Sequence, residues 1–145
     1  LGKDGVRIAK QQALDYVFGY AVGLDLTRRD RQGEAKKAGR PWDTGKAFDR
    51  SAPCAAIYPV SAVGHPSEGA ITLSINGELR QQGDLNELIW SVPEVISMLS
   101  ESFELKAGDL IFTGTPAGVG PLQRGDRIEG AIAGLGTLGI TLSSD

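Results

Sequence analysis

The sequence has one cysteine and one histidine, and each scarcity excludes a class of site. A single cysteine rules out an internal disulfide and a cysteine metal cluster. Cys54 lies in the apolar run CAAIYPV, so we expect it to be a buried small hydrophobic residue rather than a nucleophile. His65 stands between glycine and proline without a nearby acid or base, which favours a loop residue over a catalytic one.

Long apolar runs are also missing. No stretch approaches the roughly 20 apolar residues of a transmembrane helix, and no signal peptide is visible. We therefore expect a cytoplasmic protein without a membrane partner. The net charge of −3, from 15 basic and 18 acidic residues, argues against nucleic acid as a partner.

The composition favours a β-rich globular domain. The hydrophobic fraction of 41% is ordinary, whereas 20 glycines in 145 residues exceed the usual share of about 7%. These values predict a turn-rich, strand-rich fold rather than a helix bundle. The elements predicted along the chain, given below, make this an α+β, β-rich fold with a few short helices and a mixed or antiparallel sheet. The length suits a single domain over residues 1–145. Because the chain starts with Leu1 rather than methionine, we also expect an upstream part.

The most informative stretch is residues 23–48, GLDLTRRDRQGEAKKAGRPWDTGKAF. A strand is predicted over Tyr20–Thr27, because large apolar residues alternate along one of its faces. The opposite face carries small residues and one acid, Asp25. A strand face of small residues followed by one carboxylate offers little surface for packing, so it indicates the wall of a cleft.

A polar helix is predicted from Thr27 to about Ala38. Thr27 and Asp30 fit a capping box, in which a hydroxyl is followed three residues later by an acid. On this helix Arg29 and Gln32 lie three residues apart and share a face.

Lys46 adds an amine to this segment after a proline–tryptophan break. Between Asp25 and Arg50 there are eight basic residues and five acidic ones, a local excess of three positive charges in an acidic protein. Two interpretations stay open. The run is either a solvated basic helix face or a binding site for a small anionic ligand.

Local patterns predict the remaining elements. Residues 70–83 alternate in polarity and contain Asn76-Gly77, a strong hairpin signal. Ser91 and Glu94 fit a second capping box, at the start of a helix over Val92–Phe103. We also expect a short helix over Ala9–Tyr16 and strands over Pro53–Val60, Leu110–Phe112, Arg127–Ile132 and Thr137–Leu142.

A glycine-rich loop, TGTPAGVG, occupies residues 113–120. It matches neither a P-loop nor a dinucleotide-binding turn, because Pro116 interrupts it and no helix follows. Again two interpretations stay open. The loop is either a backbone nest for a carboxylate, helped by the hydroxyls of Thr113 and Thr115, or a tight turn that requires glycine.

Five segments resemble, in order, the fumarylacetoacetate hydrolase family, and within it the bacterial fumarylpyruvate and acylpyruvate hydrolases. They are GYAVGLDLTRRDRQ (19–32), GRPWDTGKAF (39–48), INGELRQQGD (75–84), IWSVPEVISMLS (89–100) and GDLIFTGTPAGVG (108–120). The resemblance implies a mixed β-sheet roll of the fumarylacetoacetase C-terminal-domain type and a homodimer. It also implies that the chain is the C-terminal portion of a longer catalytic domain.

The resemblance implies roles for particular residues as well. The family's Glu-x-Glu metal pair and its catalytic His/Glu pair are absent from these 145 residues, so we expect upstream sequence to complete the site. Within the chain, the family pattern makes Asp25 a ligand of Mg²⁺ or Mn²⁺. It makes Lys46, Arg29 and Gln32 catalytic, and it makes Thr115, Gly114, Arg29 and Lys46 substrate-binding.

The expected function is therefore metal-dependent hydrolysis of a carbon–carbon bond in a 2,4-dioxo acid, such as fumarylpyruvate or another acylpyruvate of aromatic catabolism. The substrate would be a small anionic oxo acid. Two alternatives remain: decarboxylation of oxaloacetate, and an inactive fragment without the metal-binding pair. We predict that one cleft brings together Asp25, Arg29, Gln32, Lys46 and Thr115.

Overall fold

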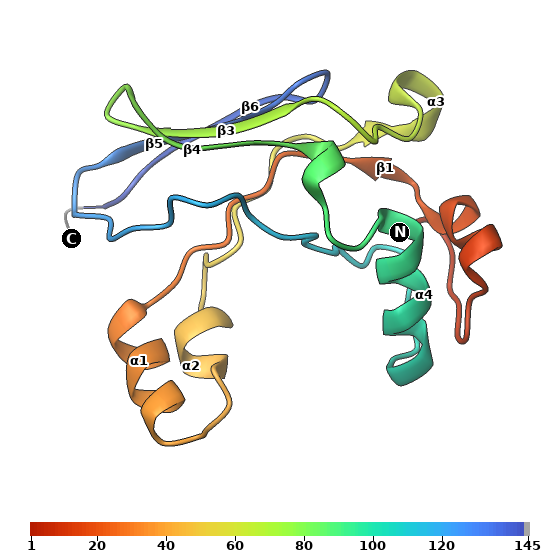
Figure 1. Ribbon diagram of the computed structural model, residues 1–145, viewed down its shortest axis with the longest axis horizontal. Helices are drawn as coiled ribbons and strands as arrows, with labels where there is room; N and C mark the ends of the chain where they lie inside the picture. Colours follow the sequence, from red (N-terminus) through yellow and green to blue (C-terminus); the bar gives the residue numbers. More distant parts are fainter. Residues whose placement is uncertain (144–145) are drawn as a thin grey trace.

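The computed structural model describes residues 1–143, which are organised around a four-stranded sheet (Figure 1). Its strands lie in the order β4-β3-β5-β6, and every pairing is antiparallel. The fold is α+β and sheet-rich with a few short helices, as predicted from the sequence. The strands are β3 (Ala70–Ile75), β4 (Glu78–Asp84), β5 (Arg127–Ile132) and β6 (Gly136–Thr141).

The two hairpins of the sheet confirm the turn and strand predictions. Asn76 and Gly77 connect β3 to β4 with φ of 54° and 84°, the left-handed pair that matches the twist of the flanking strands. Glycines with positive φ also occur in the turn after β5, at Gly134, and at the first residue of β6, Gly136. β6 begins and ends one residue earlier than expected.

A small hydrophobic core forms where α4 (Val92–Ser102) packs on η1 (Lys10–Tyr16). The predicted capping box of α4 is present, because the backbone N–H of Ser91 donates to Glu94 Oε2 at 2.8 Å. The expected helix over Ala9–Tyr16 is a 3₁₀ helix that begins one residue later. The buried members of this core are Ile8, Ala13, Ile96 and Leu105.

Two extended segments, 19–26 and 51–59, run antiparallel to each other. β1 (Gly19–Tyr20) pairs with β2 (Tyr58–Pro59), and Gly23 forms an isolated bridge with Cys54. The predictions of one continuous strand in each segment were therefore too long. Prolines within 51–59 lack the N–H that a regular ladder needs.

The alternation within residues 20–27 is nevertheless confirmed. Val22 and Leu24 are buried, with 2% and 5% of their surface exposed, whereas Asp25 is exposed. The strand predicted at Leu110–Phe112 is absent, since this stretch is irregular and forms no ladder with the other described residues. Three short turns of helix were not predicted: α2 (Asp43–Lys46), α3 (Val60–Val63) and η2 (Leu85–Glu87).

The helices α1 (Arg29–Lys37) and α2 pack on each other and project away from the sheet (Figure 1). Within α1 the one buried residue is Ala35, and within α2 it is Gly45. The backbone N–H of Arg28 donates to the carbonyl of Gly45 at 3.0 Å, which joins the two helices at the end nearest the sheet. The pair thus contains little apolar packing of its own.

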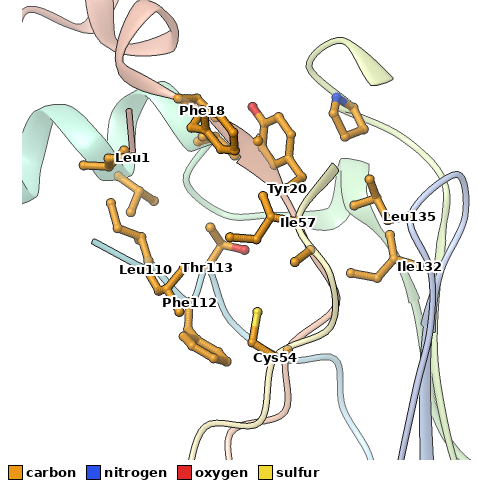
Figure 2. A pocket seen from close by; sticks show the side chains of 18 of the residues that line it. Leu1, Phe18, Tyr20, Cys54, Ile57, Leu110, Phe112, Thr113, Ile132 and Leu135 are labelled. Atoms are coloured by element: carbon orange, nitrogen blue, oxygen red, sulfur yellow. The ribbon is translucent and has the colours of Figure 1, made fainter. Parts of the chain in front are cut away.

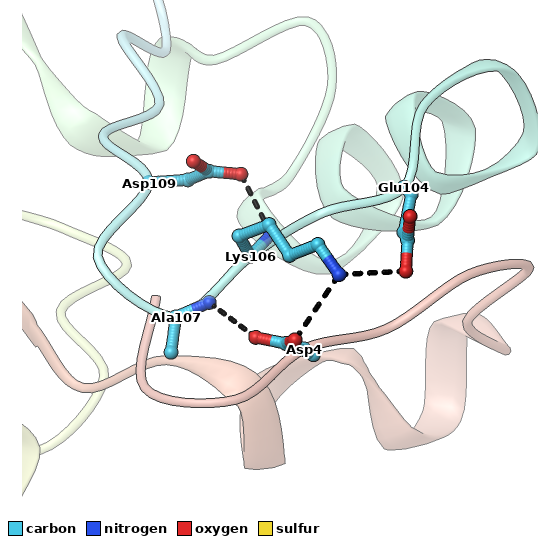
Figure 3. Close-up of polar contacts among 5 residues, drawn as sticks. All are labelled: Asp4, Glu104, Lys106, Ala107 and Asp109. Carbon is cyan, nitrogen blue, oxygen red and sulfur yellow. Dashed lines mark hydrogen bonds and ion pairs between the residues drawn. The ribbon is translucent and has the colours of Figure 1, made fainter.

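A cluster of charged side chains joins the N-terminal segment to residues 104–109 (Figure 3). Lys106 Nζ contacts carboxylate oxygens of Asp4 at 3.2 Å and Glu104 at 2.6 Å. The hydrogen bond from the backbone N–H of Ala107, followed by the one from Lys106, holds the pKa of Asp4 below its usual value. The backbone N–H of Lys106 donates to Asp109 Oδ2 at 2.7 Å, which fixes the start of the segment that leads to residues 113–120.

None of the helices within residues 1–143 has the length and apolar character that crossing a membrane requires.

Candidate functional site

Asp25 lies at the end of the extended segment 19–26, where the chain enters α1. Its Oδ1 atom is 2.5 Å from Lys46 Nζ. Lys46 also donates to the hydroxyl of Thr27 at 3.0 Å, so its ammonium is held between a carboxylate and a hydroxyl. The side chains of Lys46 and Asp25 keep 30% and 47% of their surface exposed, which leaves both accessible from solvent.

The predicted capping box of Thr27 and Asp30 was wrong. The residue that precedes the first turn of α1 is Arg28, and no side chain caps this helix end. Thr27 instead accepts its hydrogen bond from Lys46, 19 residues later in the chain. The hydroxyl that the local pattern assigned to capping the helix is therefore bonded to the ammonium of a residue distant in the chain.

Close approach of the two helices places Lys46 beside Asp25. A Cβ atom at Gly45 would lie 3.0 Å from the backbone nitrogen of Gln32, tighter than ordinary van der Waals contact. The guanidinium of Arg28 lies over the ring of Phe48, 4.3 Å from its centre, and this cation–π contact ties the chain after α2 to the start of α1. Glycine at position 45 therefore lets α2 dock with its last residue, Lys46, directed at Asp25.

Arg29 and Gln32 share a face of α1, as their spacing predicts. Arg29 Nη1 donates to Gln32 Oε1 at 3.2 Å. Arg29 lines the same cavity as Asp25 and Lys46, whereas Gln32 is outside the lining and contacts Arg29.

Most residues of the segment 113–120 also line this cavity. Gly114 and Thr115 both line it, and Gly114 has a φ of 125°. Thr115 is exposed, and its hydroxyl accepts a hydrogen bond from Gln81 Nε2 at 2.9 Å. The loop thus faces the cavity with a hydroxyl and with irregular backbone.

The cavity has a volume of about 1090 Å³ and is open to solvent. Four of the five residues predicted to converge line it, and the fifth, Gln32, contacts one of them. The polar residues of the predicted set give the lining one carboxylate, one guanidinium, one ammonium and one hydroxyl. The guanidinium, the ammonium and the hydroxyl can each donate a hydrogen bond to an oxygen of a small anion, in a lining whose three acidic and three basic residues balance. The residues are Asp25, Arg29, Lys46 and Thr115.

Metal coordination is the one predicted feature that these residues do not supply by themselves. Mg²⁺ and Mn²⁺ prefer several oxygen ligands, near-octahedral for Mg²⁺. Asp25 is a suitable oxygen donor, but it is paired with Lys46. Among residues 1–143 no group of three or more His, Cys, Asp or Glu side chains is arranged to hold a metal ion. The described residues therefore do not fit a complete metal site.

A second, apolar cavity of about 280 Å³ adjoins the first (Figure 2). Gly23, Phe112 and Gly114 line both cavities, so the segments that carry them form the wall between the two. Figure 2 shows Phe18 and Ile57 around the apolar cavity, together with Cys54. Cys54 is exposed, which corrects the prediction of a buried residue: it bridges Gly23, which has no side chain to cover it.

His65 has a partner that the sequence did not reveal. Its Nδ1 atom is 2.7 Å from the hydroxyl of Tyr20, and the two rings meet edge to face. Burial raises the pKa of the Tyr20 phenol. Neither residue lines the large cavity, so the structure assigns His65 no catalytic role.

Gln81 is a residue of this site that the sequence reasoning missed. It lines the large cavity and contacts Thr115, yet it lies 34 residues away from it in the chain. Its strand reads ELRQQGD, in which nothing local distinguishes Gln81 from Gln82. The two glutamines differ in that Gln81 contacts the loop that lies on β4.

Comparison with known proteins agrees with the fold. The family model "Fumarylacetoacetate (FAA) hydrolase C-terminal" matches residues 1–143. Fumarylpyruvate hydrolase from a Ralstonia species is 44% identical over 142 residues, which are 98% of this chain and 73% of that protein. The mitochondrial oxaloacetate tautomerase FAHD1 of Mus musculus is 47% identical over 135 residues, which are 93% of this chain and 61% of that protein.

The crystal structure of fumarylpyruvate hydrolase from Pseudomonas aeruginosa in complex with Mn²⁺ and pyruvate is 55% identical, with a TM-score of 0.97. The match covers 100% of this chain and 62% of that one. This chain therefore spans between about three fifths and three quarters of the length of these three relatives. The identities, the coverage and the shared fold lead to one conclusion: the chain belongs to the fumarylacetoacetate (FAA) hydrolase C-terminal family.

Proposed function

We propose that this chain belongs to a divalent-metal-dependent hydrolase that cleaves a carbon–carbon bond in an acylpyruvate such as fumarylpyruvate. The observation that carries the proposal is the convergence of Asp25, Arg29, Lys46 and Thr115 on one cavity. The relatives named fumarylpyruvate hydrolase support the substrate class. Hydrolysis of an acylpyruvate releases pyruvate, the molecule bound in the Pseudomonas structure.

The residues divide into two functions in this proposal. Arg29 binds the substrate carboxylate, for which the planar fork of a guanidinium is well suited, and Gln32 orients Arg29 through its amide oxygen. Thr115 and the backbone of Gly114, which line the same cavity, bind the same end of the substrate. Lys46 stabilises negative charge that develops on the substrate oxygen as the bond breaks.

The proposed cofactor is Mg²⁺ or Mn²⁺, with Asp25 as one ligand. The Mn²⁺ in the Pseudomonas relative supports a divalent ion. Because the described residues of this chain offer no complete ligand set, we assign no catalytic step to the ion. In the chain as described, a cation that binds Asp25 must first compete with the ammonium of Lys46.

A second candidate function is enolate chemistry on oxaloacetate, as tautomerisation or decarboxylation. The name of the mouse relative, 47% identical to this chain, favours it. The two candidates share the binding of a 2-oxo acid and differ in whether water attacks an acyl group. Analysis of the products separates them, because only acylpyruvate hydrolysis yields pyruvate together with a second carboxylic acid.

We retain the homodimer and the cytoplasmic location as parts of the proposal. The homodimer follows from the family resemblance. Sedimentation equilibrium of the purified protein, which measures the mass of the particle in solution, tests it. An inactive fragment is the alternative to any catalytic proposal.

The decisive experiment is to incubate the purified protein with Mn²⁺ and fumarylpyruvate and to measure pyruvate release by a coupled dehydrogenase assay. Parallel incubations with oxaloacetate test the second candidate. Release of pyruvate and fumarate in equal amounts, abolished by chelator, supports the hydrolase. Turnover of oxaloacetate alone replaces the first proposal with the second, and no turnover of either supports the inactive alternative.

A further inference from the structure

Gln81 is a buried polar side chain that the proposed chemistry does not yet use. It has 8% of its surface exposed, while both neighbours on β4, Arg80 and Gln82, are exposed. Burying an amide is unfavourable unless its hydrogen bonds are made. The partners of Gln81 therefore explain why it is buried at that place.

Both hydrogens of the Gln81 amide have partners in the glycine-rich loop. Nε2 donates to Thr115 Oγ1 at 2.9 Å and to the carbonyl oxygen of Pro116 at 2.7 Å. The Pro116 carbonyl can only accept, so the amide must present its nitrogen to the loop. This fixes the orientation of the amide, and the amide in turn fixes the role of the Thr115 hydroxyl as an acceptor toward β4.

The loop lies directly on β4. A Cβ atom at Gly118 would be 2.1 Å from the backbone oxygen of Arg80, and the φ of Gly118 is 97°. A Cβ atom at Gly83 would be 3.2 Å from the side chain of Pro116. This close backbone approach on both sides of Gln81 holds the loop where its two hydrogen bonds can form.

We propose that Gln81 is a positioning residue that keeps the Thr115 hydroxyl available as a donor to an anionic oxygen of the ligand. A hydroxyl has one proton and two lone pairs. Because one lone pair of Thr115 is used by Gln81, the proton is free to point into the cavity that both residues line. The inference rests on the proposed function, since it needs an oxo-acid carboxylate in that cavity.

Double-mutant cycles test the inference. Gln81→Met keeps the length of the side chain and removes both donors, Thr115→Val removes the hydroxyl, and Gln82→Leu on the exposed side of the same strand is the matched control. Gln81→Glu is a second variant, which keeps the shape and replaces the donor with an acceptor. Each protein is titrated with pyruvate and with the uncharged methyl pyruvate, and each is unfolded in urea.

Gln81→Met and Thr115→Val should each raise the dissociation constant of pyruvate about tenfold, the usual effect of losing one hydrogen bond to a charged group. The double variant should be no weaker than the weaker single variant, because both changes remove the same interaction. Methyl pyruvate should respond by less than about threefold, and Gln82→Leu should leave both constants unchanged. Gln81→Glu should weaken pyruvate at neutral pH and recover part of the affinity in acid, as its carboxyl regains a donor.

Other outcomes overturn the inference. Additive effects on pyruvate binding, or equal effects on pyruvate and methyl pyruvate, would show that Gln81 does not act through Thr115. Additive effects on urea unfolding would show that the hydrogen bond is absent. If unfolding shows the coupling but the wild-type protein binds no oxo acid, the proposed function fails and the ligand half of the inference fails with it, while the contact between Gln81 and Thr115 stands.

Discussion

Replacement of Lys46 by methionine separates the stability of the site from its chemistry. The change removes the ammonium that lies 2.5 Å from Asp25 Oδ1 and 3.0 Å from the hydroxyl of Thr27. A partly exposed ion pair contributes about 0.2–1 kcal/mol to folding, and a hydrogen bond contributes about 1 kcal/mol. The free energy of unfolding should therefore fall by about 1–2 kcal/mol, which lowers the melting temperature by a few degrees.

In a form of the protein that binds the metal, the effect on turnover should be much larger. Removal of a fixed charge that faces a developing oxyanion costs about 10²–10³ in rate. Pyruvate release from fumarylpyruvate gives the rate, and thermal unfolding followed by circular dichroism gives the stability. The matched control is Lys36→Met, because Lys36 is an exposed lysine in the last turn of α1. Turnover near the wild-type value in Lys46→Met, or an equal loss in Lys36→Met, would refute the assigned role.

Three further predictions concern the metal, the helix contact and the effect of pH. Calorimetric titration of the 145-residue chain with Mn²⁺ should give binding much weaker than micromolar, because Asp25 alone leaves most coordination positions to water; micromolar binding would contradict this ligand assignment. Gly45→Ala should lower the free energy of unfolding, measured in urea, by about 1–3 kcal/mol, because its Cβ would lie 3.0 Å from a backbone nitrogen of α1. The control Gly33→Ala has open space around its Cβ and should raise the free energy of unfolding by about 0.5–1 kcal/mol. Hydrogen bonds from Lys10 and then from Ser91 lower the pKa of Glu94 from its usual value of about 4.5 to about 2. The stability that this lowered pKa contributes is therefore present above about pH 4.5 and is lost as the pH falls toward 2, so Glu94→Gln should flatten the pH profile of stability in that window; an unchanged profile would contradict the pairing.

Interactions within a few residues of one another were predictable from the sequence. The turn at Asn76-Gly77 and the capping box of Ser91 and Glu94 each depend on chemistry that spans at most three residues, and both are present. The pairing of Arg29 with Gln32 on one helix face is of the same kind. Local patterns of this sort survive folding when no distant group competes for the same atoms.

Predictions failed where a distant group did compete. The predicted capping box used the hydroxyl of Thr27 for the helix start, but this hydroxyl accepts a hydrogen bond from Lys46 instead. Cys54 belongs to an apolar run, yet its partner across the bridge is a glycine that covers nothing. The contact between Gln81 and Thr115 depends on a loop that folds back onto β4, and no short pattern reports such a return.

The sparse packing of α1 and α2 has a consequence for how the protein loses its site. Regions with few buried apolar contacts open in separate cooperative units at a fraction of the global unfolding free energy. This helix pair buries little beyond Ala35 and Gly45, while it carries Arg29 and Lys46. The α1–α2 pair, with Arg29 and Lys46, can thus unfold while the sheet and the loop that carries Thr115 stay folded. Probes that follow the β-structure will report an intact protein at temperatures where the anion site has already come apart.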